Sequence, residues 1–464
     1  MRIQYDHERD VRNMKPYDHP LRQVLHEEVH SRPPVAQWPK ERILSQAFLL
    51  DAQSRQLQTN WIECLSKAFQ SKGNASQDHF FRSIELSAAP ERIIIKWELH
   101  GEFATIAAIV QQSAPVDKPL IQTRHAILDR LNAVLQKMAC PSIEAAGGQR
   151  IAAIDIAFED RSLFNDAEEV SAIFNGNTLL GSYIMSNRRA QLWTDLNLNE
   201  DGFISYYVPH NTLGSRQAGR VARRITEVET YRMAAMLAFP VAKGLSLPLR
   251  NAESDLAQMS KEIALLQTDT GIQLKKNGEF LAELSQLASK TEQWISEFGL
   301  RFTAAEAYSQ LVNKNLAELH EEAIPGIQTL VEFMDRRFQP AMGTCLWTQR
   351  RLKELSDRVS RTTQTLRTRI EFVNEEQTQA LLASMDKRAK LQLRMQETVD
   401  SLSVLVLTYY LVGLLFYVAK GGKEAGLPIY PEITAAIAAP IVAAAFFVIS
   451  KRRRARNARN AISS

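Results

Sequence analysis

One short stretch of the sequence has the residue types and the spacing of a zinc peptidase. His26, Glu27 and His30 form the pattern His-Glu-x-x-His. On a helix, positions i and i+4 share one face, so the two imidazoles could hold one zinc ion while Glu27 polarises a water molecule bound to it. The pattern therefore raises the question of whether the chain is a metallopeptidase.

The sequence after this motif does not complete such a site. Ser-Arg-Pro-Pro follows His30 directly, and the residue before a proline is disfavoured in the helical conformation, so the second ligand would lie on the final turn of a helix. Glu41 is the next acidic residue, and no second ligand-bearing helix surrounds it. We expect no metal here. The alternative is an amphipathic helix, within an N-terminal segment at residues 1–43, whose histidines hydrogen-bond to the domain on which it packs.

The composition is that of a globular protein with room for two or three domains. The chain has 464 residues, of which 45% are hydrophobic and 23% are charged. Cys64, Cys140 and Cys345 form no Cys-x-x-Cys pair, so neither a disulfide framework nor a zinc ribbon is indicated. The N-terminal residues lack the apolar segment of a secretory signal peptide. We expect most of the chain to lie in the cytosol.

Residues 44–212 have the mixed pattern of an α/β or α+β domain. Helical stretches are expected at residues 60–72 and 119–138. No glycine-rich phosphate loop or serine nucleophile elbow accompanies them, and Gly147-Gly148 lies before a strand instead of between a strand and a helix. We therefore expect no enzyme and no cofactor. The expected strands are residues 42–50, 91–99, 104–110, 150–158, 181–186, 190–198 and 202–208.

A histidine between two acidic residues lies at the end of one expected strand. Alternation along a strand places Glu98, His100 and Glu102 on one face. Trp97 and Leu99 then lie on the other face. This is ordinary strand alternation, and the acidic face is also a possible cation site.

Two apolar stretches near the C-terminus are each long enough to cross a bilayer as a helix. Residues 401–419 and 432–450 carry no charge apart from Glu432 at one edge, and about 20 residues suffice to span a hydrocarbon core about 30 Å thick. The residues between them, 420–431, leave room only for a tight turn. The sequence predicts a transmembrane hairpin at residues 401–450, with a buried core helix as the alternative for each stretch.

Basic residues flank the predicted hairpin on both sides. They account for most of the net charge of +4. By the positive-inside rule, the N-terminal domain and the tail at residues 451–464 lie in the cytoplasm, with the tail facing anionic lipid and no nucleic acid as partner. The basic residues are Lys387, Arg388, Lys390 and Arg394 before the first span, and Lys451, Arg452, Arg453, Arg454, Arg456 and Arg459 after the second.

Residues 213–400 have the pattern of helices without strands. The first helix is expected to end at Pro240 or Gly244. From Cys345 to Gly413 the chain contains no other glycine and no proline, which predicts one helix of about 70 residues, about 100 Å long. This helix would form a stalk that enters the bilayer as the first span.

One face of the expected stalk helix carries a seam of residues at steps of three and four, or of their sum. Such a seam is typical of helices that associate with their own kind. In the membrane part its members are small or polar more often than Leu402, Val406, Tyr409 and Phe416 opposite, which suits a helix-packing stripe or a pore lining. The seam begins with Leu366, Ile370, Val373, Gln377, Ala380, Ser384 and Leu391, and its predicted pore-lining members are Thr398, Ser401, Leu405, Thr408, Val412, Leu415 and Ala419.

Several long segments look like the motifs of a bacterial family of uncharacterised membrane-anchored proteins, the domain-of-unknown-function family numbered three-four-two-two. The layout in turn resembles the CorA metal-ion transporter superfamily, mainly over residues 345–464. That resemblance implies a homo-oligomer, a pentamer, in the bacterial inner membrane, with the first span lining a pore. The segments are HPLRQVLHEEVHSRPP, WELHGEF, TDLNLNEDGFISYYV, AGRVARRITEVETYRMAAMLAFPVA and LLASMDKRAKLQLRMQETVDSLSVLVLTYYLVGLLFYVAKG.

The expected outer mouth departs from the CorA pattern. CorA-like proteins carry Gly-Met-Asn there, whereas this chain has Lys420, Gly421, Gly422, Lys423 and Glu424. Glycine carbonyls could still hold an ion, but rings of lysine repel cations unless nearby glutamates offset them. Magnesium selectivity is therefore not implied. Two hypotheses stay open: a CorA-like ion channel or transporter, and a membrane-anchored interaction or regulatory protein without conduction, with the zinc peptidase third.

Overall fold

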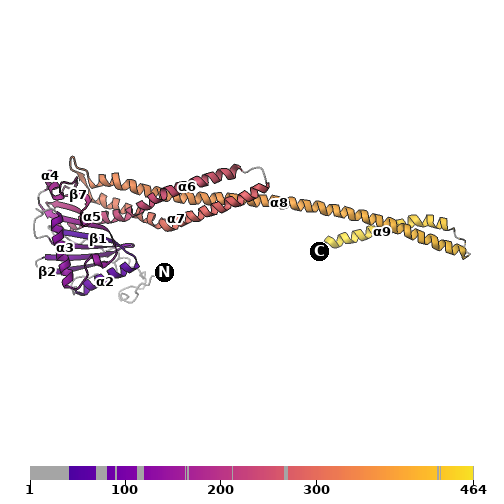
Figure 1. Cartoon of the computed structure of the whole chain (residues 1–464), viewed down its shortest axis with the longest axis horizontal. Helices are drawn as coiled ribbons and strands as arrows, with labels where there is room; N and C mark the ends of the chain where they lie inside the picture. Colours follow the sequence, from indigo (N-terminus) through magenta and orange to yellow (C-terminus); the bar gives the residue numbers. More distant parts are fainter. Residues whose placement is uncertain are drawn as a thin grey trace, which may run out of the picture. The chain divides into compact units, whose positions relative to one another are not determined.

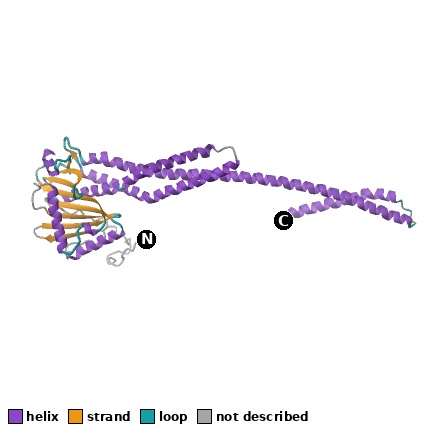
Figure 2. Cartoon of the chain, viewed as in Figure 1, coloured by secondary structure: helices purple, strands orange, loops and turns teal. Residues whose placement is uncertain are grey.

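The structure, a computed structural model, consists of a mixed sheet and a series of long helices (Figure 2). It describes residues 41–68, 81–88, 91–111, 120–161, 163–164, 167–211, 213–265, 270–425, 428 and 430–462. The motif at His26 and His30 lies outside the described residues. The chain forms two compact units, one of residues 1–265 and 282–362 and one of residues 266–281 and 363–464.

The strands of the described residues form a single sheet in the order β2-β3-β4-β1-β5-β8-β7-β6-β9. Neighbouring strands are antiparallel except β5 and β8, which are parallel. Seven strands match the predicted runs, whereas β2 and β9 were not predicted, and β9 lies in the region expected to be purely helical. The strands are β1 (Glu41–Leu49), β2 (Phe81–Ala88), β3 (Glu91–Leu99), β4 (Phe103–Gln111), β5 (Gln149–Asp160), β6 (Leu180–Ile184), β7 (Ala190–Leu198), β8 (Ile204–His210) and β9 (Glu322–Ala323).

Helices lie on both faces of the sheet (Figure 1), and each face has its own hydrophobic core. Helices α2 (Ala52–Ala68) and α3 (Leu120–Lys137) cover one face, where Trp61 and Leu131 pack against Trp97 and Leu99 of β3. Helix α5 (Ser215–Met236) covers the other face. Because successive side chains of a strand alternate between faces, the same strand contributes to both cores.

Helix α2 begins earlier than the predicted helix at residues 60–72. The Asp51 carboxylate accepts a hydrogen bond of 2.7 Å from the backbone N–H of Ser54, which is the geometry of an N-terminal cap. An aspartate at this position therefore starts the helix about two turns before the expected residue. The predicted helix at 119–138 agrees with α3.

A smaller hydrophobic cluster includes residues of β5, β7 and β8. It contains Phe164, Trp193 and Tyr207, together with the short helix α4 (Ala167–Ser171) and the 3-10 helix η3 (Ala172–Phe174); the 3-10 helix η2 (Glu144–Ala146) precedes β5. Gly181 lies directly beneath Trp193, where a Cβ atom would come within 2.4 Å of the indole ring. Only glycine fits at that position.

Helix α6 (Ala238–Leu265) follows α5 after the single residue Leu237. The first helix of this region, α5, was predicted to end at Pro240 or Gly244. That prediction is wrong, because α5 ends at Met236. Pro240 occupies the first turn of α6, where the missing N–H would have no partner within the helix, so the proline is tolerated there. The break comes before the proline, not at it.

Helices α5, α6, α7 (Thr270–Leu319) and the first part of α8 (Leu330–Glu424) are joined by polar contacts within the first unit. Arg351 of α8 contacts Glu253 of α6 at 2.6 Å. Arg224 of α5 contacts Glu318 of α7 at 3.0 Å. These pairs join α6 to α8 and α5 to α7.

Helix α8 is continuous and longer than the predicted stalk. It begins at Leu330, not near Cys345, and Pro340 lies inside it. A proline in a helix removes one hydrogen bond, and here the flanking side chains of Phe338, Ala341 and Met342 are all buried in the main core. Packing on both sides of the proline therefore keeps the helix intact.

Candidate functional site

Helices α8 and α9 (Pro431–Ile462) each contain a stretch long and apolar enough to cross a membrane. Only 6% of this stretch in α8 and none of it in α9 is buried inside the chain. The core helix of a soluble domain would be mostly buried. The two exposed apolar helices indicate association with a membrane.

The seven predicted pore-lining residues fall into two sets in the single chain. Thr398, Ser401 and Leu405 are exposed, and 67% of Leu405 is accessible. The others are Thr408, Val412 and Leu415, which are half-buried, and Ala419, which is buried.

The second helix of the same chain accounts for this difference. Leu415 lines an apolar recess together with Ile433, Ile437 and Ile441 of α9. Thr408 lies two turns before Leu415 on the same side of α8 by its spacing. The later half of the predicted seam is therefore turned toward α9, and the earlier half is open.

The predicted outer mouth is mostly helix. Helix α8 continues through Lys420, Gly421, Gly422 and Lys423 to Glu424. The carbonyl oxygen of Gly421 accepts a helical hydrogen bond of 3.1 Å from the backbone N–H of residue 425. That carbonyl is thus already used by the helix. The connection to α9 is shorter than the expected twelve-residue turn, because α8 extends to Glu424 and α9 begins at Pro431.

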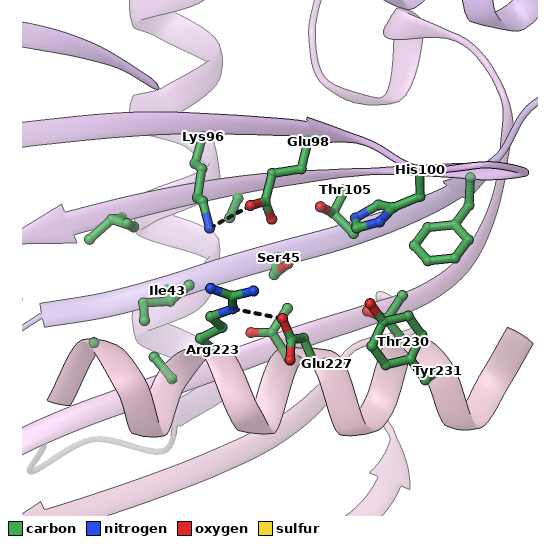
Figure 3. Close-up of a pocket in the computed structure, with 16 residues that line it drawn as sticks. Ile43, Ser45, Lys96, Glu98, His100, Thr105, Arg223, Glu227, Thr230 and Tyr231 are labelled. Carbon is green, nitrogen blue, oxygen red and sulfur yellow. Dashed lines mark hydrogen bonds and ion pairs between the residues drawn. The ribbon is translucent and has the colours of Figure 1, made fainter. Parts of the chain in front are cut away.

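A second candidate site is a cavity of about 60 Å³ within the first unit, between the sheet and α5 (Figure 3). Strands β1, β3 and β4 form one wall, and α5 forms the other. On the sheet, Lys96 Nζ lies 3.0 Å from Glu98 Oε1; on the helix, Arg223 Nε donates to Glu227 Oε1 at 2.7 Å. Figure 3 shows the two ion pairs facing each other, with both cations at one end.

The charges of this cavity are maintained by their neighbours. Burial acts to raise the pKa of Glu98, but Lys96, with His100 and Arg223, outweighs it, and the pKa is lowered. Burial acts to lower the pKa of Arg223, but Glu227 outweighs it, and the pKa is raised. Both groups are therefore ionised at neutral pH.

Two of the buried hydroxyl groups that line the cavity, on Ser45 and Thr230, lack a hydrogen-bond partner within the described part of the chain. Ser45 is 1% exposed and Thr230 is 3% exposed. An unsatisfied buried hydroxyl costs about 1–3 kcal/mol, so such groups normally meet water or a ligand.

The end of the cavity away from the cations is aromatic. The His100 ring stacks on Phe103 with centroids 4.5 Å apart. Phe103 in turn meets the edge of Tyr231, and Tyr231 stacks on Tyr308 of α7. This end of the cavity offers an apolar surface beside the charged one.

Comparison with known protein families identifies the chain. The model of the family described as "Protein of unknown function (DUF3422)" matches residues 17–457. The chain belongs to this family. No curated protein and no solved structure matches this DUF3422 chain significantly.

The acidic strand face predicted in the DUF3422 chain forms only in part, because two of its three residues line the cavity. Trp97 and Leu99 lie in the core on one face, and Glu98 and His100 line the cavity on the other, as alternation predicts. Glu102 instead pairs with Arg301 of α7 at 2.8 Å. Within the described ranges no group of three His, Cys, Asp or Glu residues is placed to hold a metal ion. The residues that complete this cavity are not those of a cation site.

Sequence reasoning missed the helical wall of the cavity. Arg223 and Glu227 are four residues apart, which is a common spacing for a solvated ion pair on any helix. Nothing local distinguishes them from Arg216 or Arg220. Only the packing of α5 across β1, β3 and β4 brings them opposite Lys96 and Glu98.

Proposed function

We propose that the chain is the subunit of a homo-oligomeric, CorA-like ion channel or transporter that lacks the Gly-Met-Asn filter. The single observation that carries the proposal is the exposure of α8 before the membrane. Every residue from 374 to 396, about 35 Å of helix, is exposed in the single chain. Large apolar side chains more than half exposed there are Leu381, Leu382, Met385, Leu391, Leu393 and Met395.

A lone helix with this many exposed apolar side chains needs partners. Isolated helices gain most of their stability by packing an apolar face, and apolar surface of this kind marks an interaction site. The same helix continues into the apolar stretch that ends near Lys423. Copies that pack along residues 374–396 therefore bring their first spans together around one axis.

The element order supports the CorA-like form of this oligomer. A mixed α/β region is followed by long helices, then by one helix that contains both stalk and first span, then by a second apolar helix with a basic end. In this proposal the assembly is a pentamer, and Thr398, Ser401 and Leu405 line the start of the ion pathway. Rings of Lys420 and Lys423 at its other end would disfavour cations.

Basic residues on both flanks of the hairpin favour a cytoplasmic location for both ends of the chain in the inner membrane. A cytoplasmic reporter fused after Ser464 would then be active, and a periplasmic reporter would be silent. Activity of the periplasmic reporter would contradict this orientation.

A membrane-anchored interaction protein without conduction is the second candidate. It is favoured by the orientation of Thr408, Val412, Leu415 and Ala419, which turn toward α9 and leave only the earlier seam for other copies. Such a protein would still oligomerise through residues 374–396, but its spans would enclose no pathway.

Liposome flux separates the two candidates. The purified full-length chain would be reconstituted and assayed with K⁺, Mg²⁺ and Cl⁻, while its mass in detergent gives the number of subunits. We expect an oligomer that passes at least one ion, with flux blocked by Ser401→Trp on the seam. Leu402→Trp, at the next residue, which points about 100° away around the helix, is the matched control and should conduct. An oligomer that passes none of these ions supports the anchor, and a monomer excludes both.

A further inference from the structure

The cavity between the sheet and α5 is not part of the proposed ion pathway, and it has the chemistry of a binding site. Two of its buried hydroxyls, on Ser45 and Thr230, point into the space and have no partner among the described residues. They come from different elements, β1 and α5, so they approach the space from opposite walls. Groups of this kind need a polar partner inside the cavity.

We propose that this cavity binds a small zwitterion of the amino-acid class. Its carboxylate lies at Lys96 and Arg223, and its ammonium group lies at Glu98 and Glu227. Figure 3 shows the two cations at one end and the two carboxylates next to them, one of each on either wall. A zwitterion aligned against this arrangement meets an opposite charge at both of its ends.

The balance of charge argues against ligands that carry a single charge. With two cations and two carboxylates, the four groups sum to zero. An anion drawn to Arg223 would also approach Glu227, which is 2.7 Å from the same guanidinium. A cation drawn to Glu98 would likewise approach Lys96 at 3.0 Å. A neutral molecule with separated charges avoids both penalties.

The size and the walls of the cavity limit the ligand further. A volume of about 60 Å³ excludes a nucleotide. The aromatic end, formed by Phe103 and Tyr231, suits a short aliphatic side chain or the methylene groups of the zwitterion. The hydroxyls of Ser45 and Thr230 then hydrogen-bond its charged groups.

Calorimetric titration of the full-length chain in detergent tests the proposal. The probes are glycine, alanine and serine, with acetate, methylammonium and glycerol as analogues that carry only the negative charge, only the positive charge or no charge. We expect at least one amino acid to bind at least tenfold more tightly than all three analogues. Equal or tighter binding of acetate, methylammonium or glycerol would contradict a zwitterionic ligand. Absence of binding by every probe would also contradict the proposal and would mean that the cavity holds only water.

Two variants place the binding in this cavity. Thr230→Val keeps the side-chain shape and removes a hydroxyl that has no partner among the described residues, so we expect a melting temperature at least as high as that of the parent chain and about tenfold weaker binding. Glu98→Gln should weaken amino-acid binding but not acetate binding. Arg351→Met breaks an ion pair between α6 and α8 outside the cavity and should leave the affinity unchanged. Full affinity in Thr230→Val and Glu98→Gln would contradict the site. These binding measurements do not depend on ion flux. Their outcome therefore tests the binding site separately from the proposed channel.

Discussion

The guanidinium of Arg42 and the carboxylate of Asp155 form a fully buried, two-bonded ion pair between β1 and β5. Arg42 Nε donates to Oδ1 at 2.6 Å, and Nη2 donates to Oδ2 at 2.5 Å. Arg124 of α3 lies 3.5 Å from the same carboxylate and pairs with Asp201 at 2.7 Å. The pair therefore fastens the two central strands to each other and to the helix that covers them.

Loss of the Asp155 carboxylate should strongly destabilise the fold. Asp155→Leu leaves Arg42 buried without this carboxylate, and breaking a buried pair from one side typically costs about 3–5 kcal/mol of unfolding free energy. We expect this loss in urea unfolding of the full-length chain. Arg42→Met in the same background should recover part of it, because the uncompensated charge is removed. Arg188→Ala, which breaks an exposed pair with Glu322, is the control and should cause no measurable change.

Cys64 and Cys140 should form a disulfide under mild oxidation. Their Sγ atoms lie 2.9 Å apart, so the bond requires a shift of less than about 1 Å. Burial, with the neighbouring Cys64, raises the pKa of Cys140 to about 12 and keeps it a thiol. Cys64 is then the attacking group: its thiolate displaces one thiolate from oxidised glutathione. Cys140 loses its proton to the departing glutathione thiolate as its sulfur displaces glutathione from the mixed disulfide.

Intact-mass measurement after non-reducing alkylation checks this bond. We expect the loss of two hydrogens and a Cys64–Cys140 peptide cross-link. Cys345, whose pKa is raised to about 11 by burial, has no disulfide partner and serves as the internal control that stays reduced. Persistent glutathione on Cys64, without the cross-link, would mean that Cys140 cannot reach it.

Acid should weaken the fold partly through Glu98. Burial opposes ionisation of this carboxyl, but Lys96, His100 and Arg223 lower its pKa below the ordinary 4.5. A group with a lowered pKa in the folded chain stabilises that chain above its unfolded pKa, and this stabilisation is lost as the pH falls through the folded value. Thermal melts from pH 7 to pH 3 should therefore show a smaller decrease in melting temperature for Glu98→Gln than for the parent chain. An identical decrease in both would show that the ion pair contributes nothing.

The sequence predicts local features of this molecule well and pairings across the chain poorly. The alternation of Trp97 and Leu99 with Glu98 is visible in the sequence because a strand has a period of two. The buried pair of Arg42 and Asp155 is not, since its members are 113 residues apart and neither stands in a recognisable motif. For the same reason, the sequence did not show that α5 forms the second wall of the cavity.

Proline also misled sequence reasoning, at Pro240. Pro240 was expected to be a possible end of a helix, yet it lies in the first turn of α6, and Pro340 lies in the interior of α8. At Pro240 the position in the first turn removes the conflict, and at Pro340 the buried neighbours offset it. Local rules give the cost of such a residue, whereas the tertiary packing that offsets the cost appears only in the fold.

The exposed half of the seam should be the face on which copies of the chain meet. Cysteines introduced at Ser384, Ser401 and Leu405, in a background without the three native cysteines, should cross-link between subunits, because these positions are exposed in the single chain and share one helical stripe. A cysteine at Leu415 should cross-link less, since α9 of the same chain already covers that side. A cysteine at Tyr409, which is 75% exposed but lies off the stripe, is the control. It tests whether cross-linking depends on exposure alone or on lying on the stripe. If position 409 cross-links as readily as position 401 on non-reducing gels, then the copies do not meet along this stripe, and the proposed pathway loses the residues that would line it.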